Sequence, residues 1–457
     1  MATERPQYYT ERPQYYDVYL SILREELMPA MGCTEPIAVA YAAALARETL
    51  GARPERARIN CSANIIKNVK SVTVPNTGGL QGIAAAATAG IVGGTASAKL
   101  EVLESVTEEN RTEIRKLLAE NYCEASLAEG IEGLYIEAIV TAGDQRAEVI
   151  ISETHTGVAR IRKNGVTIFE RDAGSSPSAT GGNAGAASFA AASSVSGATR
   201  TAAEAGTYAA LNVHDIIAFA NSVEIDHIAD VLERQIHMNE AIADEGLANR
   251  WGASVGKTIL ERGDSSVSAR ARAKTAAGSD ARMGGCPMPV VINSGSGNQG
   301  LTVSLPVVEY ARELGVSHER LLRALVLSNL VALEQKSQIG KLSAYCGAVS
   351  AAVGSGAAIT YLYGGSEERI AATITNAIAT SSGILCDGAK SSCAAKIATA
   401  LESAILAHDM SARGRGFSPG EGLVGENVEQ TIRNIGHVGS VGMRPTDLDI
   451  IDIMLRT

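Results

Sequence analysis

The feature that most constrains this fold is a change of hydrophobic period along the chain. From Ala57 to about Ile168, β-branched and polar residues alternate in runs such as LYIEAIVTAG, with turn-forming residues between them. Helical stretches near residues 82–98 and 108–121 interrupt these strands. From Val213 onward, apolar residues recur at helical spacing almost to the C-terminus. The sequence therefore predicts an α+β fold in which a small mixed α+β domain is followed by an all-helical domain.

The segments around these two domains have their own signatures. The heptapeptide TERPQYY occurs twice in tandem near the N-terminus, a unit too short for a repeat architecture. A low-complexity stretch rich in Gly, Ala, Ser and Thr can bury little apolar area. We expect a flexible tail (1–16), N-terminal helices that carry GCTEP (17–56), the α+β domain (57–172), a linker or insertion (173–210) and the helical domain (211–457).

Composition narrows the classes of partner. A net charge of −10 without a Lys/Arg cluster argues against nucleic acid as a partner. The most apolar stretches, residues 83–98 and 344–363, consist mostly of Ala, Gly and Ser, which predicts buried helices and no membrane span. The seven cysteines show no short-spaced disulfide framework, and no signal peptide opens the chain. Both observations predict a cytoplasmic protein with reduced thiols. The many small residues favour close packing between helices. For this reason we also expect the protein to form a homo-oligomer.

The stretch ILCDGAKSSCAAKIATA contains Cys386 and Cys393, and Cys386 lies forty residues after Cys346. Seven residues of continuous helix rise about 10.5 Å, too far for two thiolates on one compact cluster. Both can be ligands only if DGAKSS is not regular helix. Gly388 disfavours helix, and Ser391 or Ser392 can act as the N-cap of the helix that follows. The sequence therefore predicts Cys386 on a loop and Cys393 in the first helical turn. The alternative is that these cysteines are small core residues.

GCTEP provides a further thiol, because Cys33 or Thr34 can lie at the N-cap of a helix with Glu35 in its first turn. A helix N-terminus lowers the pKa of a thiol and makes it a better ligand or nucleophile. The alternative is a buried cysteine beside a cap. The seven histidines show no metal-binding spacing, and His227 and His237 are predicted to be structural.

GSGNQG at residues 295–300 fits G-x-G-x-x-G, but a second helix follows it where a dinucleotide site needs a strand. A glycine-rich turn at a helix N-terminus still suits an anion such as a carboxylate. The alternative is a sharp turn without a ligand. The side chains that could add donors are Ser294, Ser296, Asn298 and Gln299.

Three motifs together resemble the L-cysteine desulfidase family, which is related to the catalytic chain of the iron–sulfur L-serine dehydratases. They are GCTEPIAVA, SANIIKNVKSVTVPNTGGLQGIAAAATAG, and CGAVSAAVGSGAA with ILCDGAKSSCAAKIATA. The resemblance runs from about Tyr19 to Leu455. It implies a 4Fe-4S iron–sulfur cluster held by three thiolates with one iron open to substrate. It also implies elimination of a β-substituent from an amino acid without pyridoxal phosphate.

The resemblance also implies a ligand set. In the dehydratases one cysteine is followed by a second about forty residues on and a third shortly after. Cys346, Cys386 and Cys393 follow this order, although the last gap is shorter here. The cysteine of GCTEP is thought essential in the desulfidases, so Cys33 competes with Cys393 for the third position. The other cysteines are Cys286, a further candidate, and Cys61 and Cys123, which are expected to be structural.

The expected reaction is β-elimination from L-cysteine to hydrogen sulfide, pyruvate and ammonia. The turn at 295–300, with Asn64 from a SANIIKN strand, would hold the substrate carboxylate. Glu35 or Lys390 would remove the α-proton. The alternatives are a dehydratase acting on L-serine or a related β-hydroxy amino acid, a non-catalytic iron–sulfur or small-molecule sensor, and a pyridoxal enzyme using Lys390 or Lys341.

Overall fold

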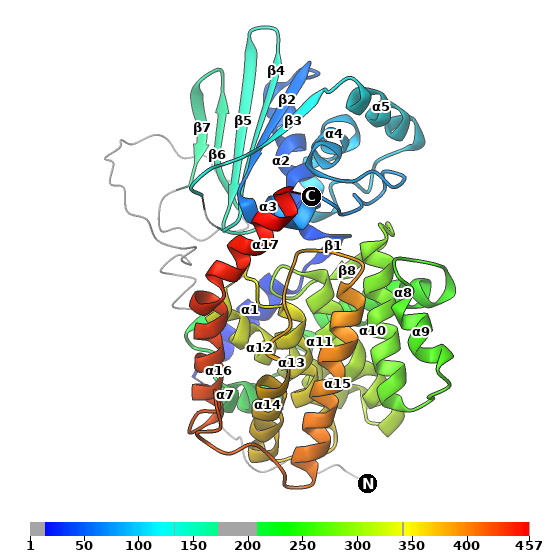
Figure 1. Ribbon diagram of the computed structural model, residues 1–457, viewed down its shortest axis with the longest axis vertical. Coiled ribbons are helices and arrows are strands. Elements are labelled where there is room, and N and C mark those ends of the chain that lie inside the picture. Colours follow the sequence, from blue (N-terminus) through cyan, green and yellow to red (C-terminus); the bar gives the residue numbers. More distant parts are fainter. Residues whose placement is uncertain (1–13, 132, 172–207, 341, 457) are drawn as a thin grey trace, which may run out of the picture.

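The computed structural model describes residues 14–131, 133–171, 208–340 and 342–456. A body containing a sheet lies above a larger helical body in Figure 1. This arrangement confirms the expected fold class, an α+β part and a helical C-terminal domain. Most of the expected tail and linker, and Lys341, lie outside the described residues.

The sheet has six strands in the order β3-β2-β4-β5-β6-β7. β2 pairs with β3 in parallel, and the other neighbours pair antiparallel. Alternate residues of β4, Ile136, Ala138 and Val140, are fully buried, as expected for a strand with one face on the core. The strands are β2 (Arg56–Cys61), β3 (Cys123–Leu127), β4 (Tyr135–Ala142), β5 (Gln145–Ser152), β6 (Val158–Lys163) and β7 (Val166–Glu170).

Helices cover this sheet and pack closely on one another. α2 contacts β4 and β5, and α4 contacts α2 and β2. A Cβ added to Gly90 of α4 would lie 2.1 Å from the carbonyl oxygen of Ala40 in α2, so only glycine permits this approach. The small residues therefore bring helices together as expected. The helical elements of this body are α2 (Thr34–Leu50), α3 (Ala63–Val69), α4 (Ile83–Gly93), the 3₁₀ turn η1 (Ala96–Glu101) and α5 (Glu108–Ala119).

In the helical body, α13 contacts α11, α12, α14 and α15, and it is built largely of buried Gly, Ala and Ser. No helix in the described ranges is both long and apolar enough to cross a membrane. The long helical run expected over residues 213–247 is broken near Val223, and α9 and α10 were not anticipated. The helices are α7 (Val213–Ser222), η2 (Ile225–His227), α8 (Ala229–Ala248), α9 (Val255–Glu261), α10 (Val267–Met283), α11 (Gly297–Leu314), α12 (His318–Ile339), α13 (Gly347–Leu362), α14 (Glu367–Ser381) and α15 (Cys393–Ala412).

The N-terminal helices divide between the two bodies. α1 (Tyr16–Glu26) packs in the helical body, where the ring of Tyr16 lies edge-on to Phe219, whereas α2 packs in the sheet body. Tyr208, in the expected linker, is buried and donates a hydrogen bond to Glu26. The short strands β1 (Pro29–Met31) and β8 (Pro289–Val291) pair antiparallel.

The C-terminal elements reach back from the helical body to the sheet body, and Figure 1 shows α17 beside α3. Lys67 of α3 forms an ion pair with Asp447 of α17, and their side chains are only 1% and 13% exposed. Lys70 also donates to the carbonyl oxygen of Met454. These elements are α16 (Val428–His437), the π-helical turn η3 (Val438–Gly442) and α17 (Arg444–Arg456).

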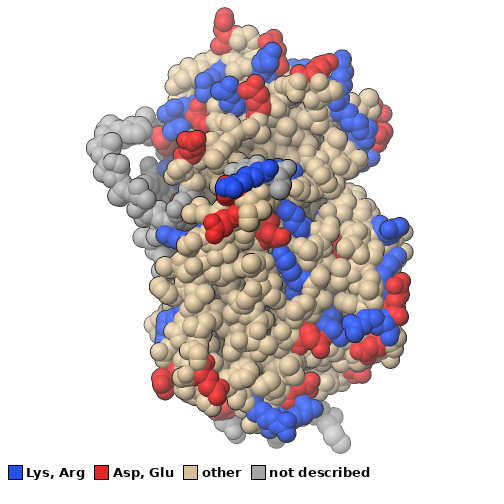
Figure 2. All heavy atoms as spheres, in the orientation of Figure 1, with Lys and Arg blue, Asp and Glu red and all other residues tan. Residues whose placement is uncertain are grey.

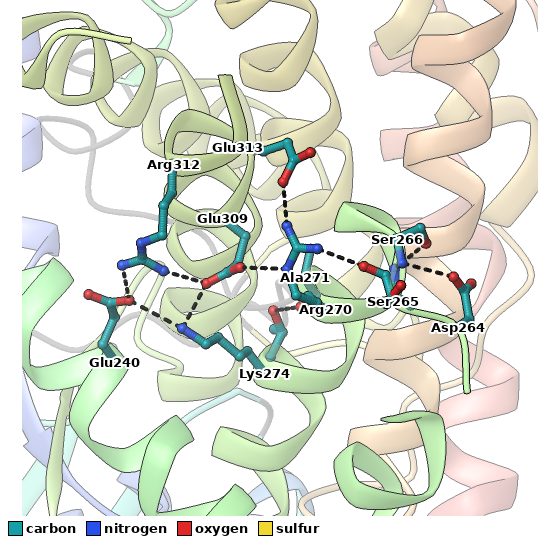
Figure 3. A network of polar contacts seen from close by, with 12 residues as sticks. Glu240, Asp264, Ser265, Ser266, Arg270, Ala271, Lys274, Glu309, Arg312 and Glu313 are labelled. Carbon is teal, nitrogen blue, oxygen red and sulfur yellow. Dashed lines mark hydrogen bonds and ion pairs between the residues drawn. The ribbon is translucent and has the colours of Figure 1, made fainter. Parts of the chain in front are cut away.

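An ion-pair network joins α8, α10 and α11 around the carboxylate of Glu309, whose side chain is 4% exposed (Figure 3). Lys274 lies 2.7 Å, Arg312 2.5 Å and Arg270 3.5 Å from its oxygens. Glu309 is the buried member of this network, whereas its three cations remain partly exposed and each has a second acidic partner, Glu240 or Glu313.

We expect Glu309→Gln to lower the free energy of unfolding by about 2 kcal/mol, because the buried carboxylate loses its charge-assisted contacts with Lys274, Arg312 and Arg270. The matched control is Glu313→Gln, whose half-exposed side chain pairs with the same Arg270 and should cost less than about 1 kcal/mol. Urea denaturation of the three proteins measures the difference. Equal effects of the two substitutions would contradict this account of Glu309.

Candidate functional site

The helices α2, α11, α13 and α15 all begin at one cavity. Cys33 and Cys346 are the N-caps of α2 and α13, Ser296 is the N-cap of α11, and Cys393 is the first residue of α15. Each helix N-terminus carries a partial positive charge and free backbone N–H groups. These helix N-termini therefore favour a bound anion at the cavity. Burial acts against the thiolate forms of Cys33 and Cys393 and raises their pKa.

A short antiparallel bridge brings Cys346 and Cys386 together. Tyr345 pairs with Leu385, the N–H of Cys346 donates to Ile384 O at 3.1 Å, and the N–H of Cys386 donates to Ala344 O at 2.7 Å. Cys346 donates a hydrogen bond to the Cys386 sulfur, which raises its own pKa and lowers the pKa of Cys386 to about 6. The pair can therefore present a thiolate at neutral pH.

The segment between Cys386 and Cys393 is not helical, as the sequence predicts. Gly388 has φ 86° and lies against the carbonyl group of Lys67, so the chain can turn there. The Cys393 sulfur accepts the backbone N–H of Lys390 at 3.4 Å. The negative charges of Cys386 and Cys393 both raise the pKa of Cys346, so these three thiols lie within electrostatic reach of one another.

Cys33 lies at the side of the cavity formed by α2. Burial raises its pKa, and the charges of Glu35 and Cys393 act in the same direction, whereas Arg282 opposes them. The side chain of Cys33 packs with Met283 and, at its edge, with Cys393. Cys33 therefore lies beside Cys393 in a buried setting that disfavours its thiolate.

Glu35 faces the cavity and is contacted by Thr34 and His155, both of the sheet body. Thr34 Oγ1 lies 3.1 Å from Glu35 Oε2 and donates at 2.8 Å to the carbonyl oxygen of Gly295. His155, from the loop after β5, places Nε2 3.8 Å from Glu35 Oε1, and its ring lies close to Gly295. Burial raises the pKa of Glu35, but the His155 imidazole and the Thr34 hydroxyl outweigh it, so the pKa is lowered overall. Glu35 is therefore a carboxylate at neutral pH.

Cations complete the cavity. Lys67 and Lys336, both buried, line it, and their charges favour the Cys386 thiolate. Arg282 lines it from the C-terminal end of α10 and is 2% exposed. Lys390 lies just behind, where Nζ donates to the carbonyl oxygens of Lys67 and Ala389, and burial lowers its pKa.

Most of the expected site residues meet at this cavity, but three do not line it. Asn64 was expected on a strand, which is wrong: it lies in the first turn of α3, while Lys67 and Asn68 of that helix reach the cavity. Ser294 has φ 50° and is buried in the turn before α11. Lys390 is the third. The residues brought together as expected are Cys33, Glu35, Ser296, Asn298, Gln299, Cys346, Cys386 and Cys393.

Sequence reasoning missed Lys67, Arg282, Lys336 and His155. Lys67 lies within the SANIIKNVK motif, and that position was a usable signal. Arg282 and Lys336 lie near the ends of long helices, and nothing local distinguishes them from surface cations.

A second cavity, of about 500 Å³, lies between α2, α4 and α5, whereas the thiol-lined cavity holds about 110 Å³. The larger cavity is lined by residues such as Arg47 and Glu113 and includes no cysteine. Chemistry, not size, therefore identifies the candidate site.

The donor set fits an iron–sulfur cluster better than a single ion. In the ranges that the structure covers, no three His, Cys, Asp or Glu side chains converge tightly enough to hold one metal ion. A four-iron cluster distributes its thiolate ligands over separate iron atoms, so they lie farther apart. Free thiols, helix N-termini and buried lysines around one cavity suit a cluster whose thiolates carry negative charge.

Comparisons with known proteins identify the family of this chain. The profile of the serine dehydratase alpha chain matches residues 97–452, which include the last three cavity cysteines but not GCTEP. A UPF0597 protein of Lachnoclostridium phytofermentans is 50% identical over 436 residues, covering 95% of this chain and 99% of the relative. One from Desulfitobacterium hafniense is 48% identical, with 96% of each chain covered. These names state no substrate. The chain belongs to the serine dehydratase alpha chain family.

Proposed function

We propose that this protein is an iron–sulfur-dependent lyase that eliminates hydrogen sulfide from L-cysteine without pyridoxal phosphate. The observation that carries the proposal is the convergence of Cys33, Cys346, Cys386 and Cys393 on one cavity with an ionised Glu35. Membership of the serine dehydratase alpha chain family supports lyase chemistry at this site.

Cys346, Cys386 and Cys393 are the proposed thiolates for a 4Fe-4S cluster. The charges of Cys386 and Cys393 both act on Cys346, and Lys67 and Lys336 favour the thiolate of Cys386. When bound, a cluster with one open iron supplies a Lewis acid for the leaving group. Cys33 is then left as a separate thiol beside the substrate.

The protein's own groups bind and deprotonate the substrate. The N-terminus of α11, with Ser296 and Asn298, would hold the carboxylate, and Gln299 lies beside it. Glu35, oriented by Thr34 and His155, would take the α-proton from carbon onto its carboxylate. The C–S bond then breaks with its electron pair leaving on sulfur, and the released aminoacrylate takes up water to give pyruvate and ammonia.

A dehydratase acting on L-serine is the second candidate, because the family name specifies serine. Sulfur and oxygen leaving groups can both bind an open iron, so the cavity alone accommodates either substrate. The test is to give the anaerobically purified protein L-cysteine and L-serine separately. We expect hydrosulfide and pyruvate from L-cysteine at a higher kcat/KM than pyruvate from L-serine. The reverse order would replace the desulfidase with a dehydratase.

The two candidate bases are separated by substitution. We expect Glu35→Gln to lower kcat by about 10²- to 10⁴-fold, because a positioned base contributes a factor of this size. The matched variant Lys390→Met should retain most turnover, since Nζ of Lys390 points to the carbonyl oxygens behind the cavity. Steady-state kinetics at equal iron content measures both. Loss of kcat in Lys390→Met alone would assign the base to Lys390.

A further inference from the structure

Arg282 is a buried cation that makes no ion pair with the residues that the structure describes, although the charges of Cys33 and Glu35 favour its charged form. Within the part of the chain that the structure describes, no Asp or Glu lies at ion-pair distance from it, and its side chain hydrogen-bonds only neutral oxygens. Nη1 donates to Asn298 Oδ1 at 2.5 Å, and Nη2 donates to the carbonyl oxygen of Gly32. Nε is buried and has no acceptor. An unpaired buried charge is costly unless an anion compensates it.

The surroundings hold this guanidinium against the cavity. A Cβ added to Gly297 would lie 2.4 Å from Cζ and 2.6 Å from Nε of Arg282, so glycine at the start of α11 is what admits the side chain. Its bond to Gly32 O ties it to GCTEP, and its bond to Asn298 ties it to α11. Arg282 is therefore fixed between the N-termini of α2 and α11.

We propose that Arg282 binds the α-carboxylate of the substrate and so restricts the enzyme to free α-amino acids. The inference rests on the proposed function but adds a residue and a selection rule to it. The free Nε–H and the charge of Arg282 match a carboxylate, the anion that arginine binds best. Gln299 Oε1, also buried without a partner in the same cavity, matches an α-ammonium group.

Equilibrium binding tests this without turnover. L-Alanine carries the carboxylate and ammonium groups but no leaving group, and L-alaninamide is its counterpart without the negative charge. Both are titrated calorimetrically into the anaerobically purified full-length protein. We expect L-alanine to bind at least about 10-fold more tightly, the size of one charged hydrogen bond. Equal affinities, or no binding of either, would overturn the proposal.

Variants locate the effect. Arg282→Gln should bring the two affinities within about two-fold of each other, and Arg282→Lys should retain part of the preference because it keeps the charge without the fork. The matched control is Arg320→Gln, since Arg320 also has a buried, unpartnered Nε but bonds carbonyl oxygens of α13 away from the cavity. Arg320→Gln should keep the wild-type ratio. An unchanged ratio in Arg282→Gln would overturn the assignment.

The same design separates the two proposals. A preference for L-alanine that depends on Arg282, in a protein that turns over neither L-cysteine nor L-serine, would retain the carboxylate site and reject the lyase. Turnover of L-cysteine with no loss of preference over L-cysteinamide in Arg282→Gln would retain the lyase and reject Arg282 as the carboxylate ligand. Iron content, measured on every variant, shows whether a change arises from the cluster.

Discussion

Cys386→Ala is expected to abolish both iron binding and turnover. Cys386 holds the thiol with the lowered pKa, and Lys67, Lys336 and the donated hydrogen bond of Cys346 all stabilise its thiolate. Losing a direct ligand should exceed the roughly 10- to 100-fold effect of losing an outer partner. Iron and sulfide per chain, measured after anaerobic purification, give the result. Cys61→Ala is the control, because Cys61 is fully buried in the core of the sheet body.

Iron and sulfide content, measured on two further variants, decides whether Cys393 or Cys33 is the third ligand of the cluster. Cys393→Ala should lose iron as Cys386→Ala does, since the charge of Cys393 acts on Cys346 and the charge of Cys386 acts on Cys393. Cys33→Ala should keep its iron but lose turnover, because Cys33 lies beside Glu35. Iron lost in Cys33→Ala and kept in Cys393→Ala would reverse these roles.

Asp447→Ala is expected to destabilise the protein by about 3–5 kcal/mol, because it leaves the buried ammonium of Lys67 without its counter-ion. The effect should reach the site, since Lys67 also faces Cys386. Asp452→Ala is the matched control on the same helix: its ion pair with Arg456 is exposed, and its loss should cost less than about 1 kcal/mol. Urea denaturation and iron content report the two effects.

A result in which Asp447→Ala and Asp452→Ala are equally stable would show that α17 does not hold Lys67 in place. Lys67→Met separates charge from packing, because it keeps the length of the side chain and removes the ammonium. We expect Lys67→Met to be less destabilising than Asp447→Ala, since no unpaired charge is left buried, yet to bind iron more weakly.

The local parts of the site could be predicted from the sequence. Gly388 and Ser392 indicate that the segment between Cys386 and Cys393 is not helix, and the structure agrees. The sequence also predicted that Cys33 lies at the cap of a helix and that a glycine turn precedes α11, because caps and turns depend on neighbouring residues.

The wrong predictions of secondary structure occur where a short apolar run fits both the helical period and the strand period. Ile65 and Val69 are both fully buried four residues apart, which is helical spacing, but the β-branched residues of SANIIKNVK resemble a strand. Contacts between distant segments could not be read at all. His155 meets Glu35 only because the loop after β5 folds onto the turn before α11, and no local pattern encodes that approach.

The most direct test of the central claim is to quantify iron and sulfide per chain in anaerobically purified protein, record its visible absorbance, and add L-cysteine. The account predicts about four irons per chain, the broad absorbance of a 4Fe-4S cluster, and release of hydrosulfide with pyruvate. Protein that binds no iron after anaerobic reconstitution, with its four cavity cysteines intact, would contradict the account.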